Sequence, residues 1–141
     1  MEETNDLMGV LMGSNDTKDL TTYLDSLDDK YPDSLSTYIK TILKRKKISA
    51  SELIKKSRIE RTYCYQILNG RKKPGRDKIV AIALALDLSL EETQRMLTIA
   101  KEGVLYPKSR RDSILIFALN SHYTLIDTNQ LLAEYNEEEL R

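Results

Sequence analysis

The chain has little of what metal sites, disulfides and membrane spans require. It contains one cysteine, Cys64, and one histidine, His122. A single cysteine excludes an internal disulfide and a multi-cysteine zinc site, and a single histidine argues against a histidine-based metal cage or a charge relay. No apolar run approaches the roughly 18 residues of a membrane-spanning helix. Glu2 and Glu3 make the N-terminus acidic, unlike a signal or transit peptide. We therefore expect a cytoplasmic protein with no membrane association, no cofactor and no metal.

Motifs of catalytic centres are also missing. The sequence has no glycine-rich phosphate loop, no pair of carboxylates in a recognisable motif and no nucleophile beside a histidine. Enzymes need such arrangements to bind phosphate, to move a proton or to attack a substrate. We therefore predict that the chain is not an enzyme.

Signals for β-structure do not occur, and helical patterns take their place. Alternating β-branched runs and hairpin dipeptides are absent, and the prolines at 32, 74 and 107 all fall at plausible breaks. Apolar residues recur at the three- and four-residue spacing of amphipathic helices, which predicts an all-α protein. The expected helices lie over about 4–12, around 20–27, over 34–46, after Ser49, over 61–69, after Pro74, from Ser89 to near Gly103, from Ser109 and from Thr124.

The charges are distributed very unevenly, although the net charge is zero. Residues 1–36 contain nine acids and two lysines, which gives −7. Residues 37–76 contain thirteen lysines and arginines and two glutamates, which gives +11. Residues 77–120 balance, and residues 121–141 sum to −4. A basic block confined to one segment is typical of a face that binds a polyanion, although a solvated surface balanced by the acidic ends would look the same.

Residues 49–75 carry the order of signals expected for a helix-turn-helix. Ser49 and Glu52 have the spacing of a capping box, which predicts the start of a short helix. A turn at 57–60 separates it from a second helix over 61–69, and Ile59 stands where a hydrophobic staple to Cys64 is expected. Gly70 is a suitable residue to end this second helix in a left-handed conformation.

The residues in this stretch resemble the lambda-repressor/Cro-like (Xre-type) helix-turn-helix family. The resemblance rests on the Ser49-x-x-Glu52-Leu53 motif, apolar Ile59, Cys64 and Ile67, the run from Asn69 to Pro74, and the run from Leu86 to Glu92. It implies a five-helix domain in which the third helix is the recognition helix. We therefore expect an acidic helical N-terminal extension over 1–33, the helix-turn-helix domain over 34–103, and a helical C-terminal extension over 104–141 that packs on the domain or dimerises.

The resemblance also implies which residues touch DNA, because this family places the recognition helix in the major groove. Arg61, Thr62 and Gln66 take the base-contacting positions. Arginine can pair with guanine, glutamine with adenine, and a threonine methyl can meet a thymine methyl. The expected contacts to the DNA backbone come from Ser49, Ser51, Tyr65, Asn69, Arg71, Lys72, Lys73 and Arg76.

Two residues depart from the usual pattern of this family. Where a left-handed glycine commonly follows the second helix, this chain has Arg58, for which that conformation costs about 1–2 kcal/mol. Where a small residue commonly follows the helix-two leucine, this chain has Ile54. Either change could alter the angle between the two helices.

Single residues outside this motif carry weaker signals. Cys64 fits the apolar pattern of its helix, so we expect a buried thiol rather than a redox switch. His122 could sense pH, but we expect a loop histidine without a functional partner. Tyr63 and Tyr65 could stack on single-stranded bases, although one of them is expected to pack on the preceding helix.

The two extensions leave alternatives open. Residues 114–119 are apolar nearly all round, which predicts a buried helix, and this helix or the last one is the best candidate for dimerisation. The acidic run 137–139 is expected to be a frayed, solvated tail. The leucine and methionine side chains of residues 7–12 could equally bind a partner or pack on the rest of the chain.

These signals favour a sequence-specific double-stranded DNA-binding protein, a transcriptional regulator from a bacterium or phage that binds as a homodimer. The alternative is a protein-interaction adaptor that keeps the helix-turn-helix as a scaffold and binds a protein partner through its N-terminal extension. A third hypothesis combines the two: the −7 segment folds over the +11 face and competes with DNA.

Overall fold

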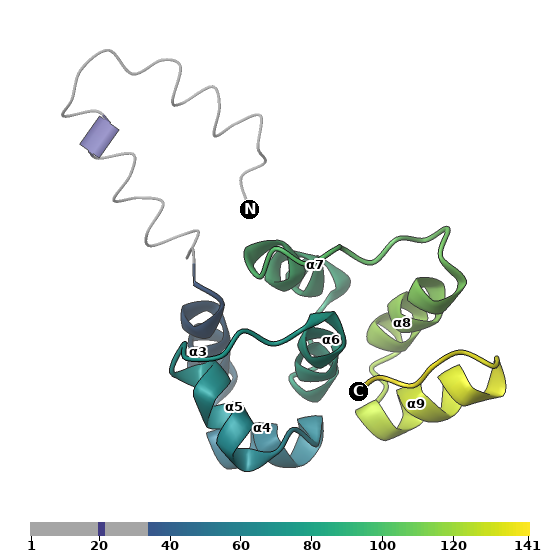
Figure 1. Cartoon of the computed structure of the whole chain (residues 1–141), viewed down its shortest axis with the longest axis horizontal. Helices are drawn as coiled ribbons and strands as arrows, with labels where there is room; N and C mark the ends of the chain where they lie inside the picture. The colour runs from purple at the N-terminus through teal and green to yellow at the C-terminus, as the bar shows by residue number, and fades with distance from the viewer. Residues whose placement is uncertain (1–19, 22–33) are drawn as a thin grey trace. The chain divides into compact units, whose positions relative to one another are not determined.

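A computed structural model describes residues 20–21 and 34–141 of the chain. The expected helices over 4–12 and around 20–27 lie outside the described residues, apart from Leu20 and Thr21. Residues 34–141 form one compact unit, and within it there are seven helices and no strand, which confirms the all-α prediction (Figure 1). The helices are α3 (Leu35–Lys46), α4 (Ala50–Ser57), α5 (Arg61–Leu68), α6 (Arg76–Ala85), α7 (Leu90–Ile99), α8 (Arg110–Asn120) and α9 (Leu125–Glu134).

Most of these helices begin at a hydroxyl cap. The side chains of Ser34, Ser49, Ser89, Ser109 and Thr124 each accept a hydrogen bond from the backbone N–H three residues further on. Each bond satisfies one of the free donors at a helix N-terminus. The predicted starts at Ser49, Ser89, Ser109 and Thr124 are therefore confirmed.

The helix starts at Ser49 and Ser89 both have the spacing of a capping box, and they differ in the structure. At the start of α7, the Ser89 hydroxyl accepts from the Glu92 N–H and the Glu92 carboxylate accepts in return from the Ser89 N–H, so the box is complete. At the start of α4, the structure records only the bond from the Glu52 N–H to the Ser49 hydroxyl. Glu92 also accepts a hydrogen bond from Arg45 at 2.6 Å, which ties α7 to α3.

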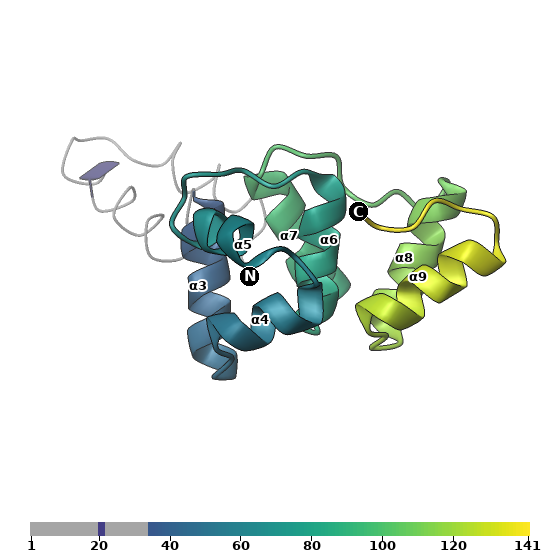
Figure 2. The same ribbon diagram turned by 60° about the horizontal axis from the view of Figure 1, so that its bottom comes forward.

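Helix α6 lies at the centre of the unit and contacts α4, α7, α8 and α9 (Figure 2). Its residues from Ile79 to Ala85 are all buried, which is why its sequence is apolar on every side. Ile39 and Ile42 of α3, Leu53 of α4 and Leu97 of α7 join the same core.

Helices α8 and α9 pack against each other and against α6. Leu115 and Leu119 of α8 and Leu132 of α9 are buried in this contact. The prediction that 114–119 is buried on all sides is wrong, however, because Phe117 is 52 % exposed and meets the ring of Tyr123 edge-on, with the ring centroids 5.6 Å apart. An apolar helix on the outer layer of a small unit has too few neighbours to cover its whole circumference.

The last residues of the chain are held in place, so the expectation of a frayed tail is also wrong. Arg111 donates hydrogen bonds to the carbonyl oxygens of Glu138 and Glu139 at 2.9 and 3.3 Å. The Leu140 N–H donates to the Asn129 side chain at 2.8 Å, and the Leu140 side chain is buried. The acidic side chains of residues 138 and 139 are exposed, while the backbone beneath them is fixed.

Two ion pairs join the start of α6 to the start of α8. Arg76 binds Asp112 through both terminal nitrogens at 2.9 and 2.7 Å, and Arg111 binds Asp77 in the same way at 3.1 and 3.0 Å. Near its start, each of the two helices carries an arginine followed directly by an aspartate, and each arginine binds the aspartate of the other helix. We call these four residues the α6–α8 clamp. Bidentate pairs of this kind fix the relative orientation of the two helices as well as their distance.

Candidate nucleic-acid interface

In the turn between α4 and α5, Arg58 adopts the left-handed conformation that the sequence analysis expects at this position. Its φ and ψ are 58° and 22°, and its N–H donates to the Ile54 carbonyl oxygen at 3.0 Å. The next residue, Ile59, is buried in the same core as Cys64. The turn therefore keeps the geometry expected of a glycine, and the side chain of Arg58 is left exposed at the surface.

Glu60 caps the recognition helix, a role that the sequence analysis did not assign. Its two carboxylate oxygens accept from the Thr62 N–H at 3.0 Å and from the Tyr63 N–H at 2.9 Å. These backbone hydrogen bonds lower the pKa of the Glu60 carboxyl. An acid directly before a predicted helix is a signal that could have identified this cap. The N–H groups of Thr62 and Tyr63 are therefore occupied by this cap and are not available to an external anion.

The side chains predicted to contact bases lie along α5. Arg61 and Thr62 are exposed and Gln66 is half-buried, while Cys64, Ile67 and Leu68 face the core. Within a helix, residues three and four apart share a face. Arg61 and Tyr65 are therefore neighbours on the surface, as are Thr62 and Gln66. The structure thus places Thr62 and the half-buried Gln66 on one face of α5, and Arg61 on the adjacent face beside Tyr65.

The end of α5 and the loop after it are held rigidly by backbone bonds. Gly70 has φ +82°, its N–H donates to the Ile67 carbonyl oxygen, and the Arg71 N–H donates to the Gln66 carbonyl oxygen at 2.9 Å. This is the Schellman arrangement of a helix C-terminus. The Asn69 side chain accepts from the Arg71 N–H at 3.0 Å, which adds a second constraint on the same loop. The loop is therefore fixed at its start, where its cationic side chains begin.

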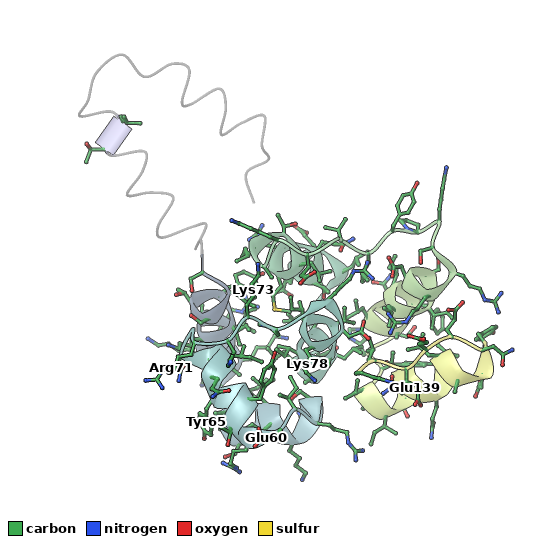
Figure 3. All side chains as sticks on the ribbon, in the orientation of Figure 1. Glu60, Tyr65, Arg71, Lys73, Lys78 and Glu139 are labelled. Atoms are coloured by element: carbon green, nitrogen blue, oxygen red, sulfur yellow. The ribbon has the colours of Figure 1, made fainter. Side chains whose placement is uncertain are left out.

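The cationic side chains of this loop point into solvent. Arg71, Lys72 and Lys73 are all exposed, and Arg71 and Tyr65 project outward from the α5 region in Figure 3. Tyr65 is 43 % exposed. Within residues 34–141, none of the three cations forms an ion pair, so their charges are not neutralised by this unit. Ser49 and Ser51 at the start of α4 are exposed as well.

Arg76 departs from the predicted contact with the DNA backbone. Besides Asp112, its guanidinium donates to the carbonyl oxygens of Gly103 and Val104, both at 2.8 Å. The pKa of Arg76 is raised, chiefly by the hydrogen bonds to Asp112. These bonds direct the guanidinium into the chain, because α8, which the resemblance does not cover, supplies a carboxylate at this position.

Tyr63 is the more buried of the two tyrosines, and the expected packing of one of them on the preceding helix stays a prediction. It is half-buried against the core, and the Lys78 ammonium lies 5.6 Å from the centre of its ring. Cys64 is fully buried, and burial raises the pKa of its thiol, which makes the thiolate less accessible. His122 has a partner that was not predicted: its Nδ1 lies 2.8 Å from the Asp87 carboxylate, with both side chains exposed.

The described part of the chain holds no cluster of three or more histidine, cysteine, aspartate or glutamate side chains that could bind a metal ion. Among the same residues, no helix is long and apolar enough to cross a membrane. The surface described above therefore remains the feature with the clearest chemistry, and its chemistry suits an anionic partner.

Comparison with known proteins supports the same conclusion. Residues 39–92 match the helix-turn-helix family, over a stretch that runs from α3 into the first turn of α7. This match confirms the resemblance to the lambda-repressor-like, Xre-type domains. No curated protein and no solved structure matches the chain significantly.

Proposed function

We propose that this chain, in which residues 39–92 form a helix-turn-helix domain, is a sequence-specific double-stranded DNA-binding protein and a transcriptional regulator from a bacterium or phage. The observation that carries the proposal is the set of exposed cations without internal partners on α5 and the loop after it. A duplex presents closely spaced phosphates that can neutralise such charges.

Each part of the surface has a separate role in this proposal. Arg71, Lys72 and Lys73 bind phosphates and position the domain, which gives affinity without sequence preference. Arg61, Thr62 and Gln66 read base edges in the major groove. Ser49, Ser51, Tyr65 and Asn69 add backbone contacts around them. Arg76 is left out of this set because its guanidinium is engaged within the chain.

Recognition of a DNA site long enough to be specific implies that two copies of the chain bind it together. A single recognition helix reads only a few base pairs, and related domains therefore bind two half-sites as a dimer. Helix α8 is the proposed contact, because the large apolar side chain of Phe117 is exposed on it. The adaptor hypothesis rests on residues 1–33, nearly all of which lie outside the described residues, and it stays a prediction.

The experiment is a fluorescence anisotropy titration with a labelled duplex from the region upstream of the protein's own gene and a scrambled duplex. We expect tighter binding to the upstream duplex. Arg61→Ala combined with Gln66→Ala should weaken that binding by about 100-fold, because each bidentate base contact contributes about 1–3 kcal/mol. It should weaken binding to the scrambled duplex much less.

A matched control removes the same residue types from another surface. Arg141→Ala combined with Gln130→Ala changes exposed side chains of the last residue and of α9, outside the proposed DNA contacts and outside α8, and should leave both affinities unchanged. Equal binding of the wild-type chain to the two duplexes, or an equal loss in both double variants, would refute the assignment of base-reading residues. Light scattering on the complex should give two chains per duplex.

A further inference from the structure

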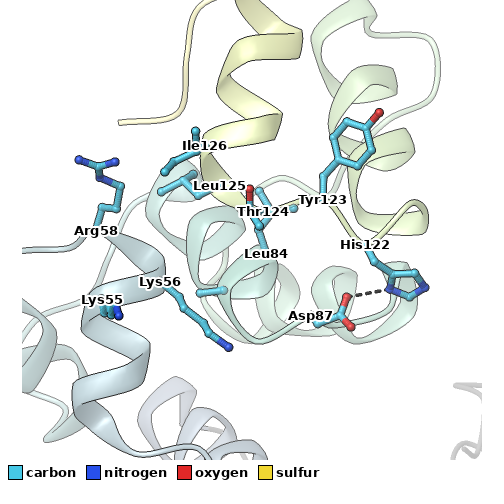
Figure 4. A pocket seen from close by; sticks show the side chains of 11 residues that line it. Lys55, Lys56, Arg58, Leu84, Asp87, His122, Tyr123, Thr124, Leu125 and Ile126 are labelled. Atoms are coloured by element: carbon cyan, nitrogen blue, oxygen red, sulfur yellow. Dashed lines mark hydrogen bonds and ion pairs between the residues drawn. The ribbon is translucent and has the colours of Figure 1, made fainter.

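A cleft of about 600 Å³ opens beside the turn between α4 and α5, and none of the three proposed base-reading residues lines it. Its walls come from the last turn of α4, the end of α6 and the corner that leads into α9 (Figure 4). This volume falls within the range of about 300–1,000 Å³ that is typical of small-molecule sites. The cleft is therefore large enough to hold a ligand.

One wall of the cleft is cationic. Lys55, Lys56 and Arg58 line it, all three are exposed, and none forms an ion pair within residues 34–141. The nearest acid in the lining, Asp87, has its carboxylate turned to His122, with which it forms a pair at 2.8 Å (Figure 4). The positive charge of this wall is thus uncompensated by the rest of the lining.

The opposite side of the cleft is apolar. Leu84 and Ala85 of α6 and Leu125 of α9 form its floor, and Ile126 stands at the rim with 51 % of its side chain exposed. When apolar atoms of a ligand cover this floor, apolar surface is removed from water, which is favourable by about 25 cal/mol per Å² of apolar surface buried. A purely ionic partner such as a phosphate backbone would leave this side of the cleft unused.

We propose that the cleft binds a small amphiphilic anion, that is, a carboxylate or sulfonate carried on an apolar body. The acid group would lie against Lys55, Lys56 and Arg58, and the apolar body would cover Leu125 and Ile126. Charge and apolar surface face each other across one cavity, so both halves of such a ligand are recognised at once. The proposal does not rest on the DNA-binding function proposed above, and none of the residues that line the cleft is among the proposed DNA contacts.

The test is a titration of the full-length ¹⁵N-labelled chain with octanoate, followed by ¹H–¹⁵N NMR spectra. We expect saturable shifts that centre on the amides of 55–58 and 123–126. Acetate, which lacks the apolar body, and octanol, which lacks the charge, should both bind much more weakly. No saturable shift with octanoate, shifts spread over the surface, or equal shifts with octanol would overturn the proposal.

Two variants test the two halves of the site. Lys55→Glu combined with Lys56→Glu should weaken octanoate binding by about tenfold, since exposed ion pairs each contribute up to about a factor of five. The matched control, Lys101→Glu combined with Lys108→Glu, reverses two exposed lysines elsewhere and should have no effect.

The apolar half is tested by Ile126→Glu, which places an acid at the rim of the cleft. Its control is Val104→Glu, at an aliphatic side chain of similar exposure that does not line the cleft. Octanoate should bind the Val104 variant like the wild type and the Ile126 variant at least about tenfold more weakly. Equal affinities for the two variants would contradict the site, even if the wild type binds octanoate.

Discussion

Arg71 and Arg76 are five positions apart and end in opposite environments. Arg71 stands exposed on the loop after the recognition helix with no ion pair inside the described unit, while Arg76 is bound to Asp112 by two hydrogen bonds and to two carbonyl oxygens. The difference teaches that the positive block of residues 37–76 is not one functional surface. Within the described unit, Arg76 is neutralised by Asp112 of α8 and Arg45 by Glu92 of α7, whereas cations such as Arg71 are left for an external partner.

The α6–α8 clamp contains a cation, Arg76, that is neutralised within the chain. The side chain of Asp112 is 7 % exposed, and it accepts from Arg76 and from the Tyr106 N–H. Asp112→Asn keeps the shape and removes the charge that Arg76 requires. We expect a loss of about 3 kcal/mol in the free energy of unfolding, because breaking a largely buried ion pair leaves the partner charge uncompensated. Urea denaturation followed by circular dichroism measures this loss.

The same substitution at an exposed pair provides the control. Asp87→Asn removes the partner of His122, where the two side chains are 59 % and 73 % exposed. Asparagine is tolerated in the left-handed conformation that Asp87 adopts, with φ 52°. We expect a change below about 0.5 kcal/mol. Equal losses in the two variants would mean that the clamp is no more than a surface contact.

The clamp also predicts how the stability of the protein depends on pH. Burial on its own would raise the pKa of Asp112, but the hydrogen bonds from Arg76 and the Tyr106 N–H outweigh burial and hold the pKa below its usual value. The pKa of Glu92 is lowered in the same way, by Arg45 and the Ser89 N–H against the effect of burial. Both carboxyl groups thus hold their protons less tightly in the folded chain than in the unfolded chain.

The sign of the effect follows from this difference. A carboxyl whose pKa is lowered by folding stabilises the protein fully above its unfolded pKa, about 4, and this contribution is lost as the pH falls through the folded pKa. Denaturation curves between pH 6 and pH 2 should therefore show stability falling below about pH 4. Asp112→Asn should make the fall shallower, and an unchanged slope in that variant would contradict the role of the clamp.

A smaller gain in stability is expected from the turn before the recognition helix. Arg58 adopts φ 58°, a conformation that costs a residue with a Cβ about 1–2 kcal/mol, whereas glycine adopts it freely. Arg58→Gly should raise the free energy of unfolding by about 0.5–1 kcal/mol, after allowance for the greater chain entropy of glycine. Arg58→Ala removes the same charge but keeps the Cβ, so it should bring no gain. A gain in both variants would show that the charge, not the backbone, is what costs stability.

The sequence was sufficient to predict the elements that depend on local signals. The caps at Ser49 and Ser89, the turn at Arg58 and the left-handed Gly70 are each encoded within a few residues, and the structure contains all of them. The buried side of α5 also follows from local spacing, since the buried residues Cys64 and Ile67 are three positions apart and the two residues between them are exposed or half-buried.

The features that the sequence did not predict depend on residues far apart in the chain. Nothing near Arg76 in the sequence reveals that Asp112 lies beside it, so the arginine was grouped with the phosphate contacts. The docked tail depends in the same way on Arg111, and the exposure of Phe117 depends on how little of α8 its neighbours cover. Long-range pairing of this kind cannot be obtained from helical periodicity.

The most direct test of the division between paired and unpaired cations is the salt dependence of DNA binding. For the wild-type chain and duplex DNA, log K should fall steeply and linearly with log salt, by about 0.9 per phosphate contact. The triple variant with Arg71, Lys72 and Lys73 changed to glutamine should lower that slope by about 2–3. A control triple variant with Lys101, Lys108 and Arg141 changed to glutamine alters exposed cations outside the interface and should keep the wild-type slope. Equal slopes for all three proteins would contradict the assignment of the loop after α5 as the surface that binds DNA.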